Sequence, residues 1–212
     1  MGQLNEAVHV KNLLEFYNIE NFVETGTGAA EVVRSVYEIN SEVNIHTIEI
    51  IEEIYKKNKV SLSYLKGVNW HLGQSSDVLP QILPELSGNT LFWMDAHFPG
   101  ADFGMASYGD EPDLSKRLPL QSELEIIVNS RDVSNDVFVI DDLRIYEDGP
   151  FEDGNWRDRL KYGADGIEFI DELFEETHYV IKSYNKQGFI ILFPVNKDIS
   201  DEAEKLLVGI VE

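Results

Sequence analysis

The sequence predicts an α/β fold in which a seven-stranded sheet carries helices on both faces. Two observations predict it. Short β-rich segments alternate with helical segments along most of the chain, and the last two β-rich segments are separated only by a turn. Alternation of this kind is typical of parallel βα units, whereas a short turn joins antiparallel strands. We therefore expect five parallel strands followed by a C-terminal antiparallel hairpin.

Composition limits the class of protein. A chain of 212 residues suits a single domain over residues 1–212, and the lack of cysteine excludes disulfides, thiolate metal sites and cysteine nucleophiles. The 39 acidic residues outnumber the 17 basic ones, for a net charge of −22, which makes nucleic acid and anionic membranes poor partners. No signal peptide or membrane span is recognisable, so we expect a cytoplasmic protein. The acidic excess has two interpretations, solubility and cation binding.

The expected elements follow from the spacing of apolar residues. Runs rich in apolar and β-branched residues predict the parallel strands at 22–24, 45–50, 68–72, 91–95 and 137–141, and the hairpin at 178–184 and 188–193. Helical spacing predicts helices at 4–17, 29–40, 51–59 and 76–86, the last interrupted by Pro80 and Pro84.

Two long segments, 98–119 and 147–166, interrupt the alternation of strands and helices. Both follow strand ends that should meet at one edge of the sheet, where ligands bind in open α/β folds. Their aromatic residues Tyr108, Trp156 and Tyr162 are candidates to stack on a ligand, or are simply exposed side chains of a lid.

The first candidate binding motif is Thr25-Gly26-Thr27-Gly28, directly after the first strand. Glycines at a strand-to-helix turn let the backbone approach a ligand closely. The dinucleotide pattern G-x-G-x-x-G would require glycine at position 31, which is Glu31. Glu24 could accept a hydrogen bond from a cationic amino group, such as that of a methionine moiety. The alternative is a tight turn with Glu24 exposed.

Two further positions suit a nucleoside. Glu49 ends the second strand, where an acidic side chain can bind both hydroxyls of a ribose; the alternative is that it caps the next helix. Ser75 lies in a polar segment after the third strand and could contact an adenine edge, or could serve as an ordinary N-cap.

Three aspartates predict a metal site. Asp95 ends the fourth strand, and Asp141 and Asp142 end the fifth. Carboxylates that converge at neighbouring strand ends repel one another unless a cation lies between them. Ligands that are all oxygen suit Mg²⁺, Mn²⁺ or Ca²⁺. The alternative is that each aspartate caps its own loop. His97, two residues beyond Asp95, is a candidate general base, or a loop residue that supports a metal ligand.

These motifs resemble a known family. The sequence FVETGTG at 22–28, Glu49, the segment 73–75 and the C-terminal hairpin resemble the class I S-adenosylmethionine-dependent methyltransferases, which have a Rossmann-like sheet. The segments 92–97 and 139–144 are similar to those of the metal-dependent O-methyltransferases, including the macrolide-sugar type and, more distantly, the catechol type. In that group the ion binds two neighbouring hydroxyls of the acceptor.

The resemblance implies a function and a set of site residues. It implies O-methylation of a hydroxyl on a small molecule or sugar, with S-adenosylmethionine and Mg²⁺ or another divalent cation as cofactors. A homo-oligomer is compatible with it. Asp95 and His97 would be catalytic, and Asp95, Asp141 and Asp142 would hold the metal. The cofactor would contact Glu24, Thr25, Gly26, Gly28, Glu49, Ser75 and Asp95.

Three departures from the family pattern keep alternatives open. Ala30 replaces the third glycine of the turn, Gln74 stands where an acidic residue is frequent, and the catalytic lysine of the catechol type has only His97 as a nearby counterpart. A metal-independent methyltransferase and a catalytically inactive nucleoside-binding module are the alternatives. A nicotinamide-dependent oxidoreductase is disfavoured by Glu24 and Glu31.

Overall fold

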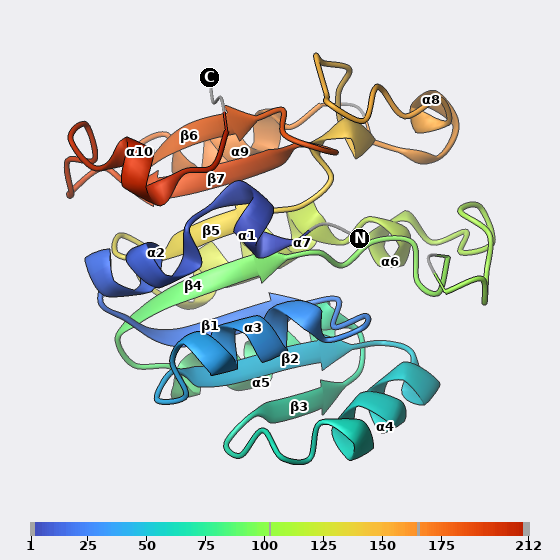
Figure 1. Ribbon diagram of the computed structural model, residues 1–212. Coiled ribbons are helices and arrows are strands. Elements are labelled where there is room, and N and C mark those ends of the chain that lie inside the picture. Colours follow the sequence, from blue (N-terminus) through green and yellow to red (C-terminus); the bar gives the residue numbers. More distant parts are fainter. Residues whose placement is uncertain (1–2, 102, 165, 210–212) are drawn as a thin grey trace.

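The computed structural model describes residues 3–101, 103–164 and 166–209, and within them the chain forms one seven-stranded sheet (Figure 1). The strand order is β3-β2-β1-β4-β5-β7-β6. The first five strands run parallel, and β7 lies antiparallel between β5 and β6, so the predicted architecture is confirmed. The strands are β1 Ile19–Thr25, β2 Asn44–Glu49, β3 Asn69–Leu72, β4 Asn89–Met94, β5 Val137–Ile140, β6 His178–Ser183 and β7 Phe189–Pro194.

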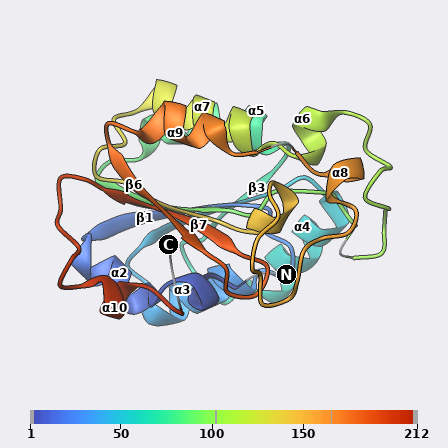
Figure 2. The same cartoon turned by 90° about the horizontal axis from the view of Figure 1, so that it is seen from above.

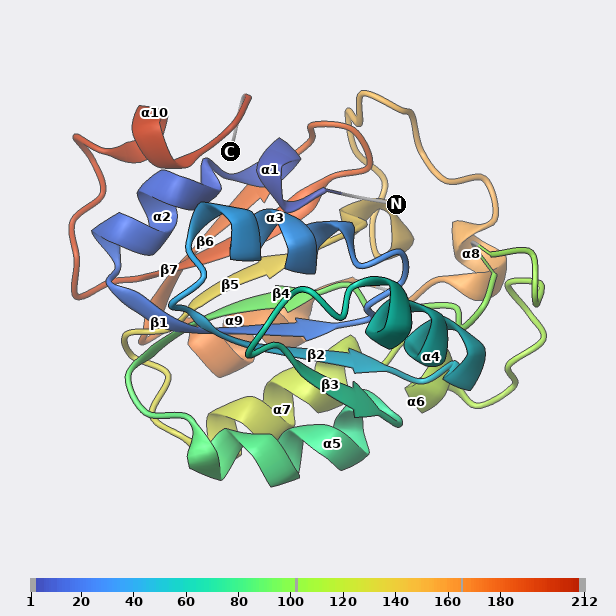
Figure 3. The ribbon, with the colours of Figure 1, turned by 60° about the horizontal axis from the view of Figure 1, so that its bottom comes forward.

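Helices cover both faces of this sheet. Figure 2 shows α5, α7 and α9 on one face and α2, α3 and α10 on the other, and Figure 3 shows α5 and α7 across the sheet from α3. The helices are α1 Leu4–Ala7, α2 Val10–Phe16, α3 Glu31–Ile39, α4 Glu52–Ser61, α5 Ser75–Ile82, α6 Leu114–Arg117, α7 Leu120–Ser130, α8 Arg159–Tyr162, α9 Glu168–Phe174 and α10 Ala203–Leu206, with two 3₁₀ turns, η1 Leu83–Glu85 and η2 Leu143–Ile145.

Strands β4 and β5 are apolar over residues 91–94 and 137–140 because both faces of the sheet are buried there. On β4, Phe92 packs into one core and Trp93 into the other, and on β5 the neighbours Phe138 and Val139 divide in the same way. All four side chains are inaccessible to solvent. Successive side chains of each strand therefore point to opposite faces of the sheet. This alternation fixes the strand register, because a slip of one residue would move every side chain to the opposite core.

The expected helix over 4–17 is wrong in one respect, since the structure divides it into α1 and α2. Val8 takes an extended conformation, with φ −139° and ψ 153°. It forms an antiparallel bridge with Leu207 near the other end of the chain, and the Val208 amide donates to the Ala7 carbonyl. A backbone that pairs with a distant segment cannot also keep its helical hydrogen bonds, and amphipathic spacing gives no sign of such a pairing.

The predicted helix over 76–86 also ends early. α5 runs from Ser75 to Ile82 with Pro80 inside it, and η1 follows. Pro84 lies in the first turn of η1, where an amide would have no helical partner, so its ring costs little there. Helices α7 and α9 had no individual prediction.

Both long segments lie at the carboxyl edge of the sheet, beyond the arrowheads of the parallel strands (Figure 1). The segment 98–119 contains α6, and the segment 147–166 contains α8. Residues 102 and 165 of these segments lie outside the described residues. In the part of the chain that the structure describes, none of the helices has the length and apolar character needed to cross a membrane.

Candidate active site

The glycine turn after β1 packs directly against the end of β4. Gly26 and Gly28 have φ of 82° and 50°, which disfavours other residues. A Cβ on Gly26 would lie 2.5 Å from the Asp95 carbonyl oxygen. The amides of Gly26 and Thr27 both donate to the Ile48 carbonyl, at 3.0 and 3.1 Å. The turn therefore joins the ends of three parallel strands around one opening.

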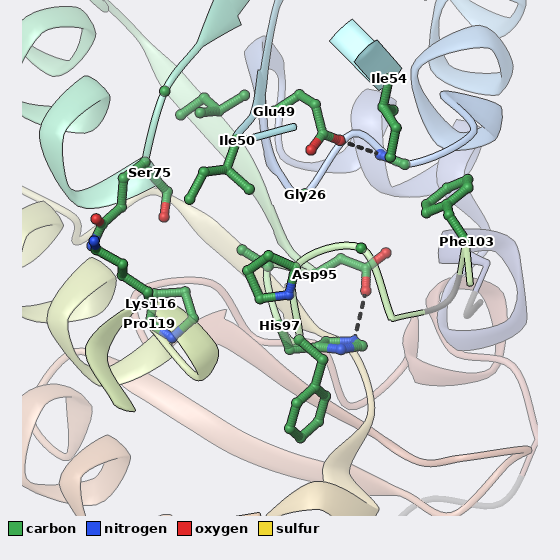
Figure 4. A pocket seen from close by; sticks show the side chains of 18 residues that line it. Gly26, Glu49, Ile50, Ile54, Ser75, Asp95, His97, Phe103, Lys116 and Pro119 are labelled. Carbon is green, nitrogen blue, oxygen red and sulfur yellow. Dashed lines mark hydrogen bonds and ion pairs between the residues drawn. The ribbon is translucent and has the colours of Figure 1, made fainter. Parts of the chain in front are cut away.

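A pocket of about 690 Å³ occupies that opening. Its lining includes the backbone of the glycine turn, the ends of β2 and β4, and the first residues of the segment 98–119. Glu49, Ser75 and Asp95 surround it from three different strand ends (Figure 4). The lining residues are Gly26, Gly28, Ile48, Glu49, Ile50, Ile54, Gly73, Gln74, Ser75, Asp95, Ala96, His97, Phe98, Pro99, Gly100, Phe103, Lys116 and Pro119.

The Glu49 carboxylate is held in place by the backbone. One oxygen accepts from the Gly28 amide at 3.0 Å and the other from the Ile51 amide at 2.8 Å. Burial raises the pKa of Glu49, and these amides partly offset the rise. Each oxygen still has a free lone pair, and the side chain lines the pocket. Glu49 thus supports the start of α4 and also presents a fixed acceptor to the pocket.

Glu24 and Thr25 lie behind the pocket rather than in its lining. Glu24 is 1% exposed and accepts a hydrogen bond from the Thr47 hydroxyl. The Thr25 hydroxyl donates to Glu123 Oε2 at 3.4 Å. Neither Glu24 nor Thr25 is among the described residues that line this pocket. Their predicted contact with a cofactor stays a prediction, and the structure shows them supporting the turn.

A cluster of ionisable groups lies where β4 and β5 end. The Asp95 amide donates to the Thr25 carbonyl and the Asp141 amide to the Met94 carbonyl, each at 3.0 Å, so the strand register sets both aspartates side by side. Asp95, His97 and Asp141 each offer a ligand atom, and these atoms lie within 4.8 Å of one another.

His97 lies between two carboxylates. Its Nε2 is 3.2 Å from Asp95 Oδ1 and 3.1 Å from Asp142 Oδ2, although neither contact has the angle of a hydrogen bond. Burial by itself would lower the pKa of His97, but the contacts and charges of Asp142 and Asp95 outweigh it and raise that pKa well above its ordinary value. The two carboxylates therefore favour the protonated form of the imidazole.

The buried carboxylate of Asp141 tests whether this cluster fits a cation. Asp141 is 2% exposed, and neither of its oxygens has a hydrogen-bond partner among the described residues. Burial and the charges of Asp95 and Asp142 raise its pKa well above the ordinary value. An unpaired buried carboxylate is costly unless a proton or a cation neutralises it. The residues therefore fit a divalent cation, with Asp95, Asp141 and His97 as its nearest ligands.

A second pocket of about 500 Å³ opens on the other side of His97. Phe98, Tyr108 and Trp156 form an aromatic cluster beside it, with ring centroids 5.0 to 5.3 Å apart. This cluster joins the segment 98–119 to the segment 147–166. The remaining lining residues are His97, Asp142, Arg144, Ile145 and Gln187.

Comparison with known proteins identifies the fold. No family model matches the sequence, and neither does any curated protein. Among solved structures, the chain is similar to a putative caffeoyl-CoA O-methyltransferase from Staphylococcus aureus, at 14% identity and a TM-score of 0.56, over 87% of this chain and 80% of that one. The chain has the class I methyltransferase fold.

Two other methyltransferase structures agree with this assignment. The Podospora anserina methyltransferase PaMTH1, with S-adenosylhomocysteine bound, matches at 15% identity and a TM-score of 0.56, over 89% of this chain and 76% of that one. An O-methyltransferase from Bacillus cereus, also in complex with S-adenosylhomocysteine, matches at 13% identity and a TM-score of 0.54, over 87% and 78% of the two chains. At these identities the likeness establishes the methyltransferase fold alone.

The fold brings most of the predicted residues together. Gly26, Gly28, Glu49, Ser75 and Asp95 line the first pocket. Asp142 lines the second pocket and contacts His97, while Asp141 is buried beneath both. The predicted metal set of Asp95, Asp141 and Asp142 stays a prediction. In the structure, the set of groups whose ligand atoms lie within 4.8 Å of one another contains Asp95, Asp141 and His97.

Sequence reasoning missed Glu123 as a residue that contacts the candidate site. It projects from α7, is 1% exposed, and hydrogen-bonds the hydroxyls of Ser75 and Thr25. Burial raises its pKa to about 7. A signal was present in the sequence: Glu123 lies among Leu120, Leu124 and Ile127 on the buried face of its helix. An acidic residue at such a position requires polar partners.

The aromatic cluster makes a prediction about the two long segments. We expect limited proteolysis to cut both 98–119 and 147–166 first, because exposed side chains such as Leu160, at 85%, and Leu114, at 52%, occupy them. Trp156→Ala removes the shared ring and should speed cleavage of both segments together. Tyr179→Ala, which removes an exposed aromatic ring on β6, is the control. Initial cleavage elsewhere, with both segments resistant, would argue against a lid.

Proposed function

We propose that this protein is an S-adenosylmethionine-dependent O-methyltransferase that acts on a hydroxyl of a small molecule or sugar with the help of a divalent cation. The observation that carries the proposal is the junction of the two pockets. His97 and Phe98 line both, and His97 lies between Asp95, on the side of the first pocket, and Asp142, on the side of the second. A methyl donor bound in the first pocket and a methyl acceptor bound in the second would both lie next to His97.

The residues of the first pocket suit a nucleoside cofactor. Glu49 would accept hydrogen bonds from the ribose hydroxyls through its free lone pairs, and the backbone at Gly26, which lines the pocket, would contact the amino-acid end. Ser75, which lines the same pocket, would contact the adenine edge. When bound, S-adenosylmethionine supplies an electrophilic methyl group, and a divalent cation supplies positive charge that lowers the pKa of an acceptor hydroxyl.

The residues of the junction would orient the acceptor and remove its proton. Asp95 and Asp141 would hold the cation, together with His97 or Asp142, and Asp95 also borders the cofactor. An imidazole near the acceptor oxygen can take the hydroxyl proton as the methyl group is transferred. His97 could act either as a ligand or as this base once a cation offsets the charges of Asp95 and Asp142, because both roles require the neutral imidazole.

The first test is cofactor binding by calorimetry. We expect Glu49→Ala to weaken S-adenosylhomocysteine binding by about 1–3 kcal/mol, because the ribose hydroxyls lose a fixed buried acceptor. Glu42→Ala, an exposed residue that follows α3 in the chain, is the matched control and should bind as the wild type does. Equal affinity of wild type and Glu49→Ala would remove the ribose assignment.

Turnover separates the proposed enzyme from its alternatives. Methyl transfer to a panel of vicinal diols, including catechols and free sugars, is followed by mass spectrometry with Mg²⁺ and with EDTA. Product that forms only with the cation supports the proposal. Equal product in EDTA would favour a metal-independent methyltransferase, and tight cofactor binding without turnover would favour a nucleoside-binding module.

A further inference from the structure

Arg144 is a largely buried cation with unused hydrogen-bonding capacity. Its side chain is 22% exposed, and its nearest carboxylate contact is a long one, from Nε to Asp142 Oδ1 at 3.7 Å. The guanidinium donates no hydrogen bond to any described residue. A guanidinium carries five N–H donors in a planar fork. Because Arg144 lines the second pocket, these unused donors are available to a ligand that enters it.

Another part-buried arginine shows how this chain normally satisfies such a group. Arg131 has its Nε 2.9 Å from Asp136 Oδ2, and its Nη2 donates to the Gly88 carbonyl at 2.8 Å and to Asp136 Oδ1 at 3.1 Å. Arg131 therefore has short, paired contacts of the strength expected for a charge-assisted bond. Arg144 has none of these, although it is held at a fixed place by η2 and by the bond from its own amide to the Gln187 carbonyl, at 3.2 Å.

The position of Arg144 associates it with the acceptor. It lines the second pocket together with Gln187, Trp156 and Tyr108, and that pocket meets the cofactor pocket at His97. Asp142, the carboxylate nearest to Arg144, also has its other oxygen 3.1 Å from His97 Nε2. Its contact with Arg144 involves Nε alone, so the two terminal amino groups of the guanidinium contact no carboxylate of the residues that the structure describes.

We propose that Arg144 binds an oxyanion of the acceptor, so that the preferred substrates are hydroxylated small molecules that also carry a carboxylate or a phosphate group. A planar guanidinium matches either oxyanion with two parallel hydrogen bonds. The aromatic cluster of Phe98, Tyr108 and Trp156 would pack against the ring that carries the hydroxyls. The identity of the ligand as an acceptor rests on the proposed function, whereas the oxyanion site itself does not.

The test uses the two simplest oxyanions on the full-length protein. Acetate and inorganic phosphate are titrated separately, at constant ionic strength and in the presence of Mg²⁺, while NMR follows the arginine Nε–Hε signals. The Arg144 signal is identified by its loss in Arg144→Gln. We expect it to shift saturably with at least one of the two ions, and the ion that binds more tightly distinguishes a carboxylate acceptor from a phosphorylated one.

Variants make the result specific. Binding is followed in parallel by the indole signal of Trp156, which lines the same pocket. Arg144→Gln should weaken the affinity for the oxyanion about tenfold to a hundredfold, which is the scale of hydrogen bonds to a charged group. Arg157→Gln removes the same charge from an exposed residue next to Trp156 and should leave binding unchanged. Arg144→Lys should restore part of the affinity for phosphate and less for acetate, because lysine lacks the planar fork.

Each outcome decides the proposal. The absence of a saturable shift with either ion, equal shifts of Arg144 and Arg157, or undiminished binding by Arg144→Gln would overturn it. Calorimetry with S-adenosylhomocysteine on the same samples keeps the two proposals apart. If the wild type fails to bind S-adenosylhomocysteine, the methyltransferase proposal is lost while the oxyanion result stands. If it binds S-adenosylhomocysteine but neither oxyanion, only the inference about Arg144 is lost.

Discussion

Mg²⁺ or Mn²⁺ is expected to raise the melting temperature of the wild-type protein, and Asp141→Asn is expected to abolish this response. The reason is that both oxygens of Asp141 are buried without partners beside Asp95 and His97. A ligand that binds only the folded state stabilises it by RT ln(1 + [L]/Kd), about 2.7 kcal/mol at a hundredfold excess over Kd. For a chain of this size that is a shift on the order of 5–10 °C. Thermal melts in EDTA and in cation measure it.

In EDTA, Asp141→Asn is expected to make the melting temperature less sensitive to pH than it is in the wild type. Burial and the charges of Asp95 and Asp142 raise the pKa of Asp141 in the folded protein. Stability linked to such a group is fully present below its unfolded pKa and is lost as the pH rises through its folded pKa. We therefore expect the melting temperature of the wild type in EDTA to fall as the pH rises above the ordinary pKa range of aspartate. The melting temperature of Asp141→Asn should fall less over the same pH range.

Controls separate a metal site from independent caps. Asp201→Asn changes the same charge at an exposed position and should retain the full metal response. If the three aspartates instead cap separate loops, wild-type melting will be identical in EDTA and in cation, and each substitution will cost about 0.5–2 kcal/mol. That pair of results would move the assignment to a metal-independent methyltransferase.

Replacement of His97 by glutamine is expected to lower kcat for methyl transfer by about 10²–10⁴-fold, the range for loss of a general base. His97 borders both pockets and contacts both Asp95 and Asp142. Glutamine keeps hydrogen-bonding capacity but cannot take a proton at neutral pH. Steady-state kinetics on an acceptor from the diol panel measure the loss, with His9→Gln, an exposed histidine outside both pockets, as the control.

Two further measurements show what His97 does. S-adenosylhomocysteine affinity should change much less than kcat, because Glu49 and the glycine turn are untouched although His97 borders the same pocket. Recovery of the lost rate at high cation concentration would identify His97 as a metal ligand rather than a base. A variant that retains the wild-type kcat would exclude both roles.

Much of the fold was predictable because its determinants are local. The apolar runs at β4 and β5, the turn between β6 and β7, and the glycines at 26 and 28 each show in a few adjacent residues. The parallel sheet follows from their alternation with helices. The break at Val8 was not predictable, because it depends on a bridge to Leu207 at the far end of the chain.

The candidate site divides in the same way. Position at a strand end was enough to select Glu49, Asp95 and Asp141, since the carboxyl ends of parallel strands must meet at one edge. Which atoms then face one another is a matter of packing. Glu24 is directed away from the pocket toward Thr47, and His97 is held between Asp95 and Asp142.

The sequence by itself determined the sheet, its C-terminal hairpin and the edge of the sheet where the candidate site residues lie. The spacing of apolar residues and the position of a residue at a strand end are both properties of neighbouring residues. Only the tertiary structure decided that Glu123 on α7 reaches Thr25 on β1, that Tyr108 and Trp156 join two long segments, and that Arg144 donates no hydrogen bond to a described residue. These facts depend on side chains far apart in the chain that meet only when the core closes, and no local pattern records such a meeting.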